Sequence, residues 1–587
     1  MLRRLAWVGL LGFAAGCTTL LGDFEVGAPA GGDDAGVDGT VQDGASQEGA
    51  AGDDAGDSAA PPGCTGPGAP QCGAHAKCVA GPTCACVTGY VVGGDAGTVD
   101  GGGTCAWAGL PLDPGLENNP PNAWAITNGT FSPTANVAGQ LDPGNVAFSQ
   151  AQICPATGAG LGSVQQKFKM PSYADAEPFG LRLSGAAVCS GETCGNQGIG
   201  FDFNGGFIAA SLAATPNPAV LCLGERAYGG DVTLTLTPWA DNCADSPSGY
   251  TAYTALLDHV DIEPVSDCPV PGVITNADFE AMTGWVVSSP TTGTCSSSAE
   301  VANGDGTAGT RGGKVVSTCN GSAASVSEAI SIPYTEIPNL ALQMDFDDTS
   351  TDPAVGLDLG FAGHSLGNMA GAGQRTGKVC VPAWAKGLAD TLGINLPFYV
   401  SGLHGSGSAE YRNFTFDNLA WVSDPSCPAA ALVIDPGFER GDPGRAWQLE
   451  VSRDFNSTPK AEIIADPSAH GGSNDLHLGI DLAGETAFAS TTVTIPPADA
   501  TGGPVLTVWY KLTASSQATF SSPFGNLGAA AAWTQATTCL DPHAAGHAFD
   551  VVFQVVGAGT TNAALTPAVD AYVDDLAVGT SASCPKN

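Results

Sequence analysis

One serine of the sequence stands in a pattern that could support nucleophilic catalysis. Ser365 lies within Gly363-His364-Ser365-Leu366-Gly367, a G-x-S-x-G run that can expose a serine hydroxyl at a sharp turn, and Asp390 and His404 follow as acid and base. Together they would perform acyl transfer, the chemistry of an esterase. That turn requires a strand and a helix in a large α/β sheet, and His404 follows Ser365 too closely for one. We therefore expect a hairpin between two strands at this position.

Tryptophans could carry a different chemistry, because a sugar ring can stack on the exposed face of an aromatic side chain. Three of them recur at one position of an internal repeat and are expected in its core: Trp124, Trp285 and Trp447. Those that could form a binding platform do not recur: Trp239, Trp384 and Trp533. Each of these three could equally pack beneath a loop.

The charge of the chain restricts its partners. It has 587 residues, with 19 Lys and Arg against 58 Asp and Glu, for a formal net charge of −39. Nucleic acids and anionic lipid surfaces are bound by clusters of Lys and Arg, so neither is an expected partner. With 81 Gly and 41 Pro, long helices are not expected either.

The N-terminus has the features of an export signal. Arg3 and Arg4 precede a short apolar stretch, and residues 1–16 end in Ala14-Ala15-Gly16 before Cys17. This junction resembles the bacterial lipobox, which implies that Cys17 is lipidated and anchors the protein to the outer membrane or cell surface of a Gram-negative bacterium. The alternative is an ordinary signal peptide. Residues 17–63 are rich in Gly, Ala and Asp and contain no Lys or Arg, which predicts a disordered acidic tether.

The cysteines after Cys17 fall into even groups. In an exported chain, 19 Cys in this arrangement predict disulfide bonds rather than metal sites. Six lie in residues 64–105, and their spacing alone leaves the pairing open. The run Cys86-Val87-Thr88-Gly89-Tyr90 resembles the C-x-x-G-Y turn of EGF-like modules, which serve as spacers or protein contacts. That resemblance implies the pairings Cys64–Cys78, Cys72–Cys84 and Cys86–Cys105.

Three segments of the remaining chain repeat one pattern: residues 106–269, 270–428 and 429–587. Each opens with a short motif that ends in Glu and is soon followed by Trp. Each later contains an alternating strand that ends in Pro, and each closes on an Asp ten residues before a Cys. The closing residues are Asp258 and Cys268, Asp417 and Cys427, and Asp574 and Cys584.

The repeat also predicts disulfide bonds. The third segment has two cysteines, so they must pair if pairing stays within the segment. Correspondence extends that bond to the other two segments and leaves the remaining cysteines to pair within their own segments, where Cys189 and Cys194 would close a small loop. The predicted bonds are Cys539–Cys584, Cys380–Cys427, Cys222–Cys268, Cys295–Cys319, Cys189–Cys194 and Cys154–Cys243.

Short alternating strands separated by Gly, Pro, Asn and Ser predict an all-β chain. It would hold three tandem antiparallel β-sandwich domains after the small disulfide-rich module and the tether. The opening and closing motifs resemble galactose-binding-like jelly rolls, as in bacterial carbohydrate-binding modules. In that family the opening Glu and closing Asp often help to hold a structural Ca²⁺. The resemblance implies the pairs Glu117 with Asp258, Glu280 with Asp417, and Glu439 with Asp574, whose alternative role is to cap turns or face solvent.

These features favour a non-enzymatic protein that is tethered to a surface and binds carbohydrate, with tandem copies adding avidity. No organic cofactor is expected. The first alternative is a structural or adhesion protein that contacts other surface proteins, and the second is the esterase. The sequence specifies neither the sugar nor the oligomeric state.

Overall fold

The computed structural model divides the chain into two compact units, residues 1–108 and residues 109–587. The described residues are 72, 75–79, 83–92, 105–111, 123–127, 130–134, 145–152, 163–173, 177–189, 197–211, 219–240, 251–281, 284–289, 297–303, 310–317, 324–334, 337–350, 356–396, 412–441, 443–452, 459–513, 517–558 and 563–586. The predicted signal, Cys17 and the tether lie outside them. In these ranges, no helix is long and apolar enough to cross a membrane.

The first unit contains two small antiparallel sheets. One pairs β1 (Ala76–Val79) with β2 (Thr83–Cys86), and the other pairs β3 (Tyr90–Val92) with β4 (Cys105–Trp107). Two of the bonds implied by the resemblance are present, Cys72–Cys84 and Cys86–Cys105. Cys78 is also disulfide-bonded, and its implied partner Cys64 lies outside the described residues.

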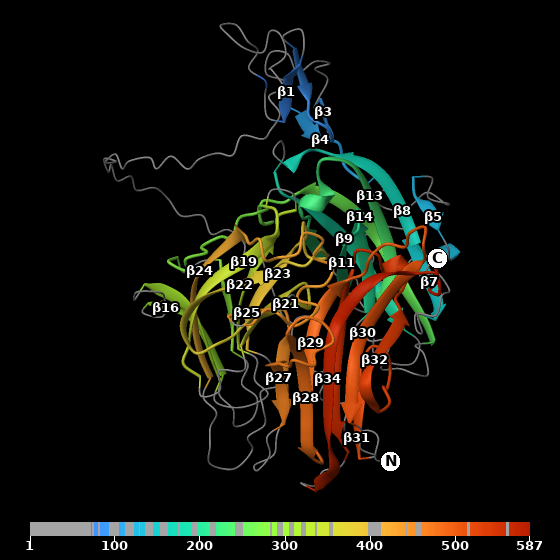
Figure 1. The fold of residues 1–587 in the computed structure, drawn as a ribbon. Coiled ribbons are helices and arrows are strands. Elements are labelled where there is room, and N and C mark those ends of the chain that lie inside the picture. Colours follow the sequence, from blue (N-terminus) through green and yellow to red (C-terminus); the bar gives the residue numbers. More distant parts are fainter. Residues whose placement is uncertain are drawn as a thin grey trace. The chain divides into compact units, whose positions relative to one another are not determined.

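The second unit contains three successive pairs of antiparallel sheets, which Figure 1 shows in colours from cyan to red. In the first pair, one sheet has the order β11 (Gly206–Ser211), β10 (Gln197–Phe203), β13 (Gly230–Ala240), β8 (Ser163–Met170), β5 (Ala125–Thr127). The other has the order β12 (Ala219–Cys222), β9 (Phe179–Cys189), β14 (Thr251–Pro264), β7 (Asn145–Gln152), β6 (Thr130–Thr134).

In the second pair, one sheet has the order β15 (Val286–Ser288), β18 (Ser325–Ser331), β23 (Ala389–Asn395), β20 (Leu357–Phe361), β21 (His364–Met369), β25 (Gly444–Arg445). The other has the order β16 (Ser297–Asn303), β17 (Arg311–Ser317), β24 (Arg412–Ser423), β19 (Leu340–Asp348), β22 (Gly373–Cys380). The chain crosses repeatedly between these sheets, as in a jelly roll. Strand β25 comes from the third repeat, so that repeat contributes to the sheet of the second.

In the third pair, one sheet has the order β26 (Gln448–Ser452), β29 (Thr486–Thr494), β33 (Ala548–Gly557), β31 (Ala518–Ser521). The other has the order β27 (Lys460–Ala465), β28 (Asn474–Leu482), β34 (Ala564–Ser581), β30 (Gly503–Thr513), β32 (Ala530–Cys539). Two short 3₁₀ helices also occur in the described part of this unit, η3 (Glu225–Ala227) and η6 (Pro542–Ala544).

Alternating apolar residues build the core of each sandwich. In β19, Leu342 and Met344 point inward and share one buried core with Leu392 and Ile394 of β23 in the facing sheet. Successive side chains of a strand point to opposite faces, so the residues between them face away from the core. The predicted all-β fold with antiparallel sandwiches is therefore confirmed.

The repeat-derived disulfide bond is present in all three sandwiches, as Cys222–Cys268, Cys380–Cys427 and Cys539–Cys584. In each case it joins the end of an edge strand, β12, β22 or β32, to the residues just after the closing strand. The other predicted bonds fall outside the described side chains; they involve Cys154, Cys189, Cys194, Cys243, Cys295 and Cys319.

The opening motif forms a hook that buries its tryptophan. In the third sandwich, Asp435 and Phe438 have positive φ angles of 54° and 57°. The Trp447 Nε1–H donates to the backbone oxygen of Asp435 at 3.1 Å, and its ring lies 4.6 Å from that of Phe438. The second sandwich repeats this hook with Asn276, Phe279 and Trp285. All three recurring tryptophans are buried, as predicted: Trp124, Trp285 and Trp447.

The closing motif forms a β-bulge. The pairing of β30 with β34 shifts register between Thr507 and Trp509, and Asp575 at this bulge has a φ of 49°. In the second sandwich, Asn418 has a φ of 54° at the corresponding shift. Asn and Asp tolerate this left-handed conformation better than most residues, which explains why they recur after the closing Asp.

Backbone carbonyls and one arginine connect the sandwiches within this unit. The Arg226 side chain in η3 donates to the backbone oxygens of Lys386, at 2.6 Å, and Ala383 in the second sandwich. His547 of the third sandwich stacks on Phe207 of the first, with ring centroids 4.2 Å apart. Charge-assisted bonds to carbonyl groups fix this partly buried guanidinium more firmly than an exposed ion pair would.

Candidate functional site

One sheet of the third sandwich turns a row of aromatic side chains away from the core. Val508 and Tyr510 of β30 are buried in the core, so Trp509 and Lys511 project from the opposite face. The same alternation in β34 projects Tyr572 between two buried neighbours. We call this surface of β27, β28, β34, β30 and β32 the outer face; these strands run side by side in the orange and red part of Figure 1.

The pairing register of β32 places Trp533 on the outer face. Trp509 pairs with Gln535 and Tyr510 with Thr534, so the same register puts Trp533 opposite Lys511; the register shifts just beyond, where Leu512 pairs with Ala530. The Lys511 Nζ atom is 4.3 Å from the centre of the Trp533 ring and 5.1 Å from that of Tyr572. The register shift that follows Trp533 is a β-bulge, a feature that is frequent beside functional sites.

The loop before β28 fixes the edges of these rings. The Trp533 Nε1–H donates to the backbone oxygen of Ser468 at 2.7 Å. His470 stacks on Trp509 with ring centroids 3.9 Å apart, and its Nδ1 lies 2.6 Å from Asp575 Oδ2. Because both rings are tied to the same loop, their positions do not depend on a ligand.

A buried histidine between two carboxylates continues the row. His477 has a side chain only 5% exposed, and its ring stacks on Tyr572 at 4.6 Å. Its Nδ1 faces Glu462 Oε1 at 3.3 Å and its Nε2 faces Asp570 Oδ1 at 2.9 Å. The hydrogen bond from His477 lowers the pKa of Asp570. The two carboxyl side chains are 48% and 41% exposed, so they can meet a ligand.

The three predicted platform tryptophans have different outcomes. Trp533 lies half-buried on the outer face. The prediction for Trp384 was wrong, because its side chain is 2% exposed in the core of the second sandwich. The Trp239 side chain lies outside the described ones. Trp509 and Tyr572 were missed, although each alternates with buried neighbours in a strand that the repeat had identified.

The structure confirms a hairpin at the G-x-S-x-G run. Ala362 and Gly363, with φ angles of 51° and 82°, form the turn between β20 and β21. The Ser365 hydroxyl, near the start of β21, donates to Asp358 Oδ1 at 2.6 Å, and burial raises the pKa of Asp358 to about 6. A strand follows the serine where the catalytic turn would need a helix. His404 lies outside the described residues.

The predicted calcium carboxylates converge on one loop in the third sandwich. Glu439 Oε1 accepts hydrogen bonds from the backbone N–H groups of Ser473, at 2.5 Å, and Asn474, at 3.0 Å. Asp574 Oδ2 accepts one from the N–H of Gly471 at 2.9 Å. The two acids therefore hold the turn that leads into β28.

The second sandwich uses its predicted pair in the same way. Glu280 Oε1 accepts from the Arg311 N–H at 3.1 Å, and Asp417 Oδ2 accepts from the Thr310 hydroxyl at 3.3 Å. The Glu117 and Asp258 side chains lie outside the described ones. Across the described residues, no group of three or more His, Cys, Asp or Glu is placed to hold a metal ion. Each pair would supply two of the six to eight oxygens that calcium prefers.

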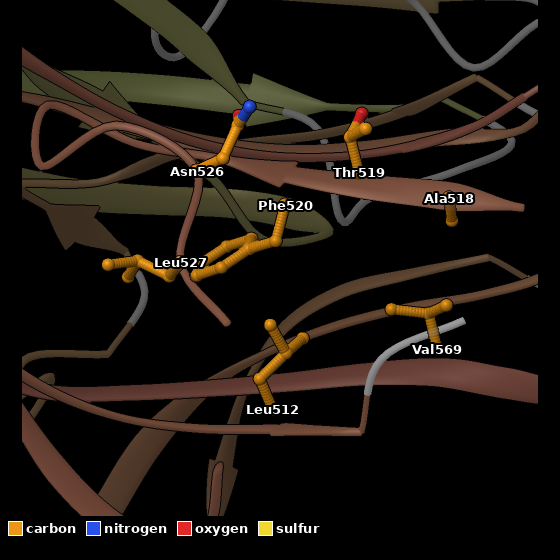
Figure 2. A pocket seen from close by; sticks show the side chains of 7 residues that line it. All are labelled: Leu512, Ala518, Thr519, Phe520, Asn526, Leu527 and Val569. Atoms are coloured by element: carbon orange, nitrogen blue, oxygen red, sulfur yellow. The ribbon is translucent and has the colours of Figure 1, made fainter. Parts of the chain in front are cut away.

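A small, partly open pocket with both apolar and polar lining residues lies in the third sandwich (Figure 2). Its volume is about 140 Å³, and it is lined by Leu512, Ala518, Thr519, Phe520, Asn526, Leu527 and Val569. Small-molecule sites usually enclose roughly 300–1,000 Å³. The outer face, rather than this pocket, is therefore the candidate site.

Comparisons with known proteins give structural likeness only. No protein-family model matches the chain, and no curated protein matches it. The carbohydrate-binding module TmCBM61, solved with β-1,4-galactotriose, is 16% identical with a TM-score of 0.18, over 26% of this chain and 98% of that one. A family 11 carbohydrate-binding module of a Clostridium thermocellum cellulase is 12% identical with a TM-score of 0.18, over 25% and 92%.

A tandem pair of such modules is also similar. It is the CBM22-1–CBM22-2 region of Xyn10C from Paenibacillus barcinonensis, 12% identical with a TM-score of 0.17, over 52% of this chain and 96% of that one. These scores leave the function to be argued from the outer face itself.

Proposed function

We propose that the outer face of the third sandwich binds carbohydrate and that the protein is a non-catalytic glycan-binding protein. The observation that carries the proposal is the row of half-buried rings Trp509, Trp533 and Tyr572 on one outward surface. A sugar ring has apolar C–H groups on its face and hydroxyl groups around its edge. Aromatic faces can pack against the first, and neighbouring polar groups can bond to the second.

Polar side chains stand where such hydroxyl groups would meet them. The Gln535 amide is exposed and pairs with Trp509 across the strands. Glu462 and Asp570 lie on the other side of Tyr572 from Lys511. The face is open rather than enclosed, which suits an extended glycan chain better than a single small sugar.

Binding of the full-length protein to a glycan array tests this proposal. We expect Trp533→Ala to weaken binding about fivefold, since one aromatic contact is worth roughly 1 kcal/mol. The matched control is Gln374→Ala, at the corresponding place in the second sandwich, where we expect no change. Failure to bind any glycan, or equal losses in both variants, would contradict the proposal; capture of a surface protein at this face would favour the adhesion alternative.

We also propose that the pairs Glu280 with Asp417 and Glu439 with Asp574 help to hold structural calcium. Support comes from their convergence on one loop in each sandwich. Anything that binds the folded state alone stabilises it, so a chelator should lower the melting midpoint and calcium should restore it. An unchanged midpoint would leave these acids as turn caps.

Surface attachment through a lipid on Cys17 is the remaining part of the proposal. It is supported by the Ala14-Ala15-Gly16-Cys17 junction and the acidic tether that follows. We expect Cys17→Ser to release the protein from the membrane fraction, whereas Cys539→Ser should not. Release of the protein with the original Cys17 from the membrane fraction under the same conditions would contradict the lipid anchor.

A further inference from the structure

The outer face already holds one ammonium group over its aromatic rings. Lys511 Nζ lies over both Trp533 and Tyr572, and it is 3.6 Å from Asp466 Oδ2. Its side chain is only 20% exposed. The negative faces of aromatic rings attract cations, most strongly when the cation is partly desolvated. These two rings therefore already have an internal cation, and a ligand amine would have to be received by carboxylates elsewhere on the outer face.

Carboxylates with free area lie farther along the same row. Glu462 and Asp570 flank His477 beyond Tyr572, and both are well exposed. The two carboxylates outnumber the single histidine ring that lies between them. Lys460 approaches Glu462 at 3.9 Å, but its side chain is 51% exposed, so solvent screens this pair and a ligand can displace it.

The net charge of the whole chain also favours cationic ligands over anionic ones. A formal net charge of −39 repels polyanions at low salt and attracts polycations. Acidic glycans, which carry carboxylate or sulfate groups, are therefore poor candidates for this face.

We propose that the outer face selects glycans that carry free amino groups, with the ammonium received by Glu462 and Asp570. This inference rests on the proposed function, and it adds the chemical class of the ligand. A sugar ring that stacks on Trp533 at one edge of the sheet would direct the glycan chain across the outer face, so that an amino group on a ring farther along reaches these carboxylates. The ion pair then adds to the stacking, because hydrogen bonds between charged groups are the stronger kind.

Three β-1,4-linked hexasaccharides of equal length test this selectivity with the full-length protein. They carry an amine, an acetamide or a hydroxyl at carbon 2: the glucosamine, N-acetylglucosamine and glucose oligomers. We expect calorimetry at pH 6 to give about tenfold tighter binding of the amine oligomer. The double variant Glu462→Gln with Asp570→Asn should reduce that preference to near unity, and added salt should reduce it as well. The matched control Glu300→Gln, in the second sandwich, should leave it unchanged.

The outcomes separate this inference from the proposed function. One outcome would overturn the inference alone. In it, the amine oligomer binds no more tightly than the glucose oligomer, and the glucose oligomer binds in a way that Trp533→Ala weakens. Amine binding that ignores Trp533→Ala and the double variant would show general attraction to an acidic protein and would also overturn it. If no hexasaccharide binds, the inference falls, and the glycan array decides on the proposed function. Unchanged melting midpoints of the variants would exclude misfolding as the cause of a loss.

Discussion

The second and third sandwiches present the same sheet to the outside with very different side chains. Pairing registers align Trp509 with Asp345 and Tyr572 with Thr415. In the second sandwich, Asp345 accepts hydrogen bonds from Thr376, at 2.5 Å, and Asn418, at 3.1 Å. Its face is thus a polar network that bonds to itself, whereas the third sandwich offers aromatic rings.

The edge strands differ as well. Pairing of β19 with β22 runs without a shift, and Asp347 lies opposite Gln374. The corresponding pairing of β30 with β32 is interrupted, and Trp533 occupies the interruption. One duplicated scaffold therefore carries the proposed binding face in one copy and a polar face in another, since side chains rather than the fold decide what a surface can bind.

Replacing the aromatic side chains of the third sandwich's outer face by their counterparts in the second sandwich should have the largest effect on glycan affinity. We expect the triple variant Trp509→Asp, Tyr572→Thr and Trp533→Gln to lower glycan affinity on the order of 100-fold, at about 1 kcal/mol for each ring. Calorimetry with the best array ligand measures this loss. A triple variant that keeps its affinity and its melting midpoint would place the binding site elsewhere and end the comparison.

The second and third sandwiches also differ in one buried side chain, for which we expect a smaller effect, on stability rather than on binding. Glu328 in β18 corresponds to Thr491 in β29, and both are buried. Burial raises the pKa of Glu328 from 4.5 to about 7. Between those pH values only the unfolded state loses the proton, so stability should fall as pH rises from 4.5 to 7 and then level off.

The variant Glu328→Gln should remove that pH dependence. We expect it to be more stable than the original at pH 8, by about 1–2 kcal/mol, and similar at pH 4. Scanning calorimetry across this range provides the measurement, and the exposed Glu300→Gln serves as the control that retains the slope. A slope that survives in Glu328→Gln would assign the effect to another carboxyl group.

The smallest expected effect concerns the bulge that both faces share. Asn418 adopts a left-handed conformation there, with a φ of 54°. Asn418→Ala should destabilise the second sandwich by about 1 kcal/mol more than Asn418→Gly, because glycine alone adopts this conformation without steric cost. Denaturant midpoints of the two variants compare them; equal midpoints would mean that the bulge relaxes.

The repeat allowed much of the fold to be predicted. Cys539 and Cys584, and their counterparts, could be paired from correspondence because a duplicated sandwich keeps its bonds in the same register. The burial of Trp447 followed from recurrence, since a core position is preserved when a scaffold is copied. Non-recurrence was a weaker guide, because Trp384 also does not recur and yet packs in a core.

The outer face was only partly predictable for a physical reason. Trp533 lies on an edge strand made mostly of Ala and Thr, so its own sequence does not show which face each residue takes; the pairing register with β30 decides that. His470 reaches Trp509 from a loop, so their stacking is a tertiary contact. Strand alternation did contain a usable signal, since Tyr572 lies between the buried residues Ala571 and Val573.

The Cys539–Cys584 bond lies on the strand that carries Trp533. That strand, β32, has a neighbour on one side only, which makes it the easiest member of its sheet to detach. The disulfide bond joins the C-terminal end of β32, at Cys539, to Cys584 in the turn after β34. The proposed glycan-binding face and the disulfide bond therefore share one edge strand: without the bond this strand would detach more readily, and a mild reductant should weaken glycan binding before the core unfolds.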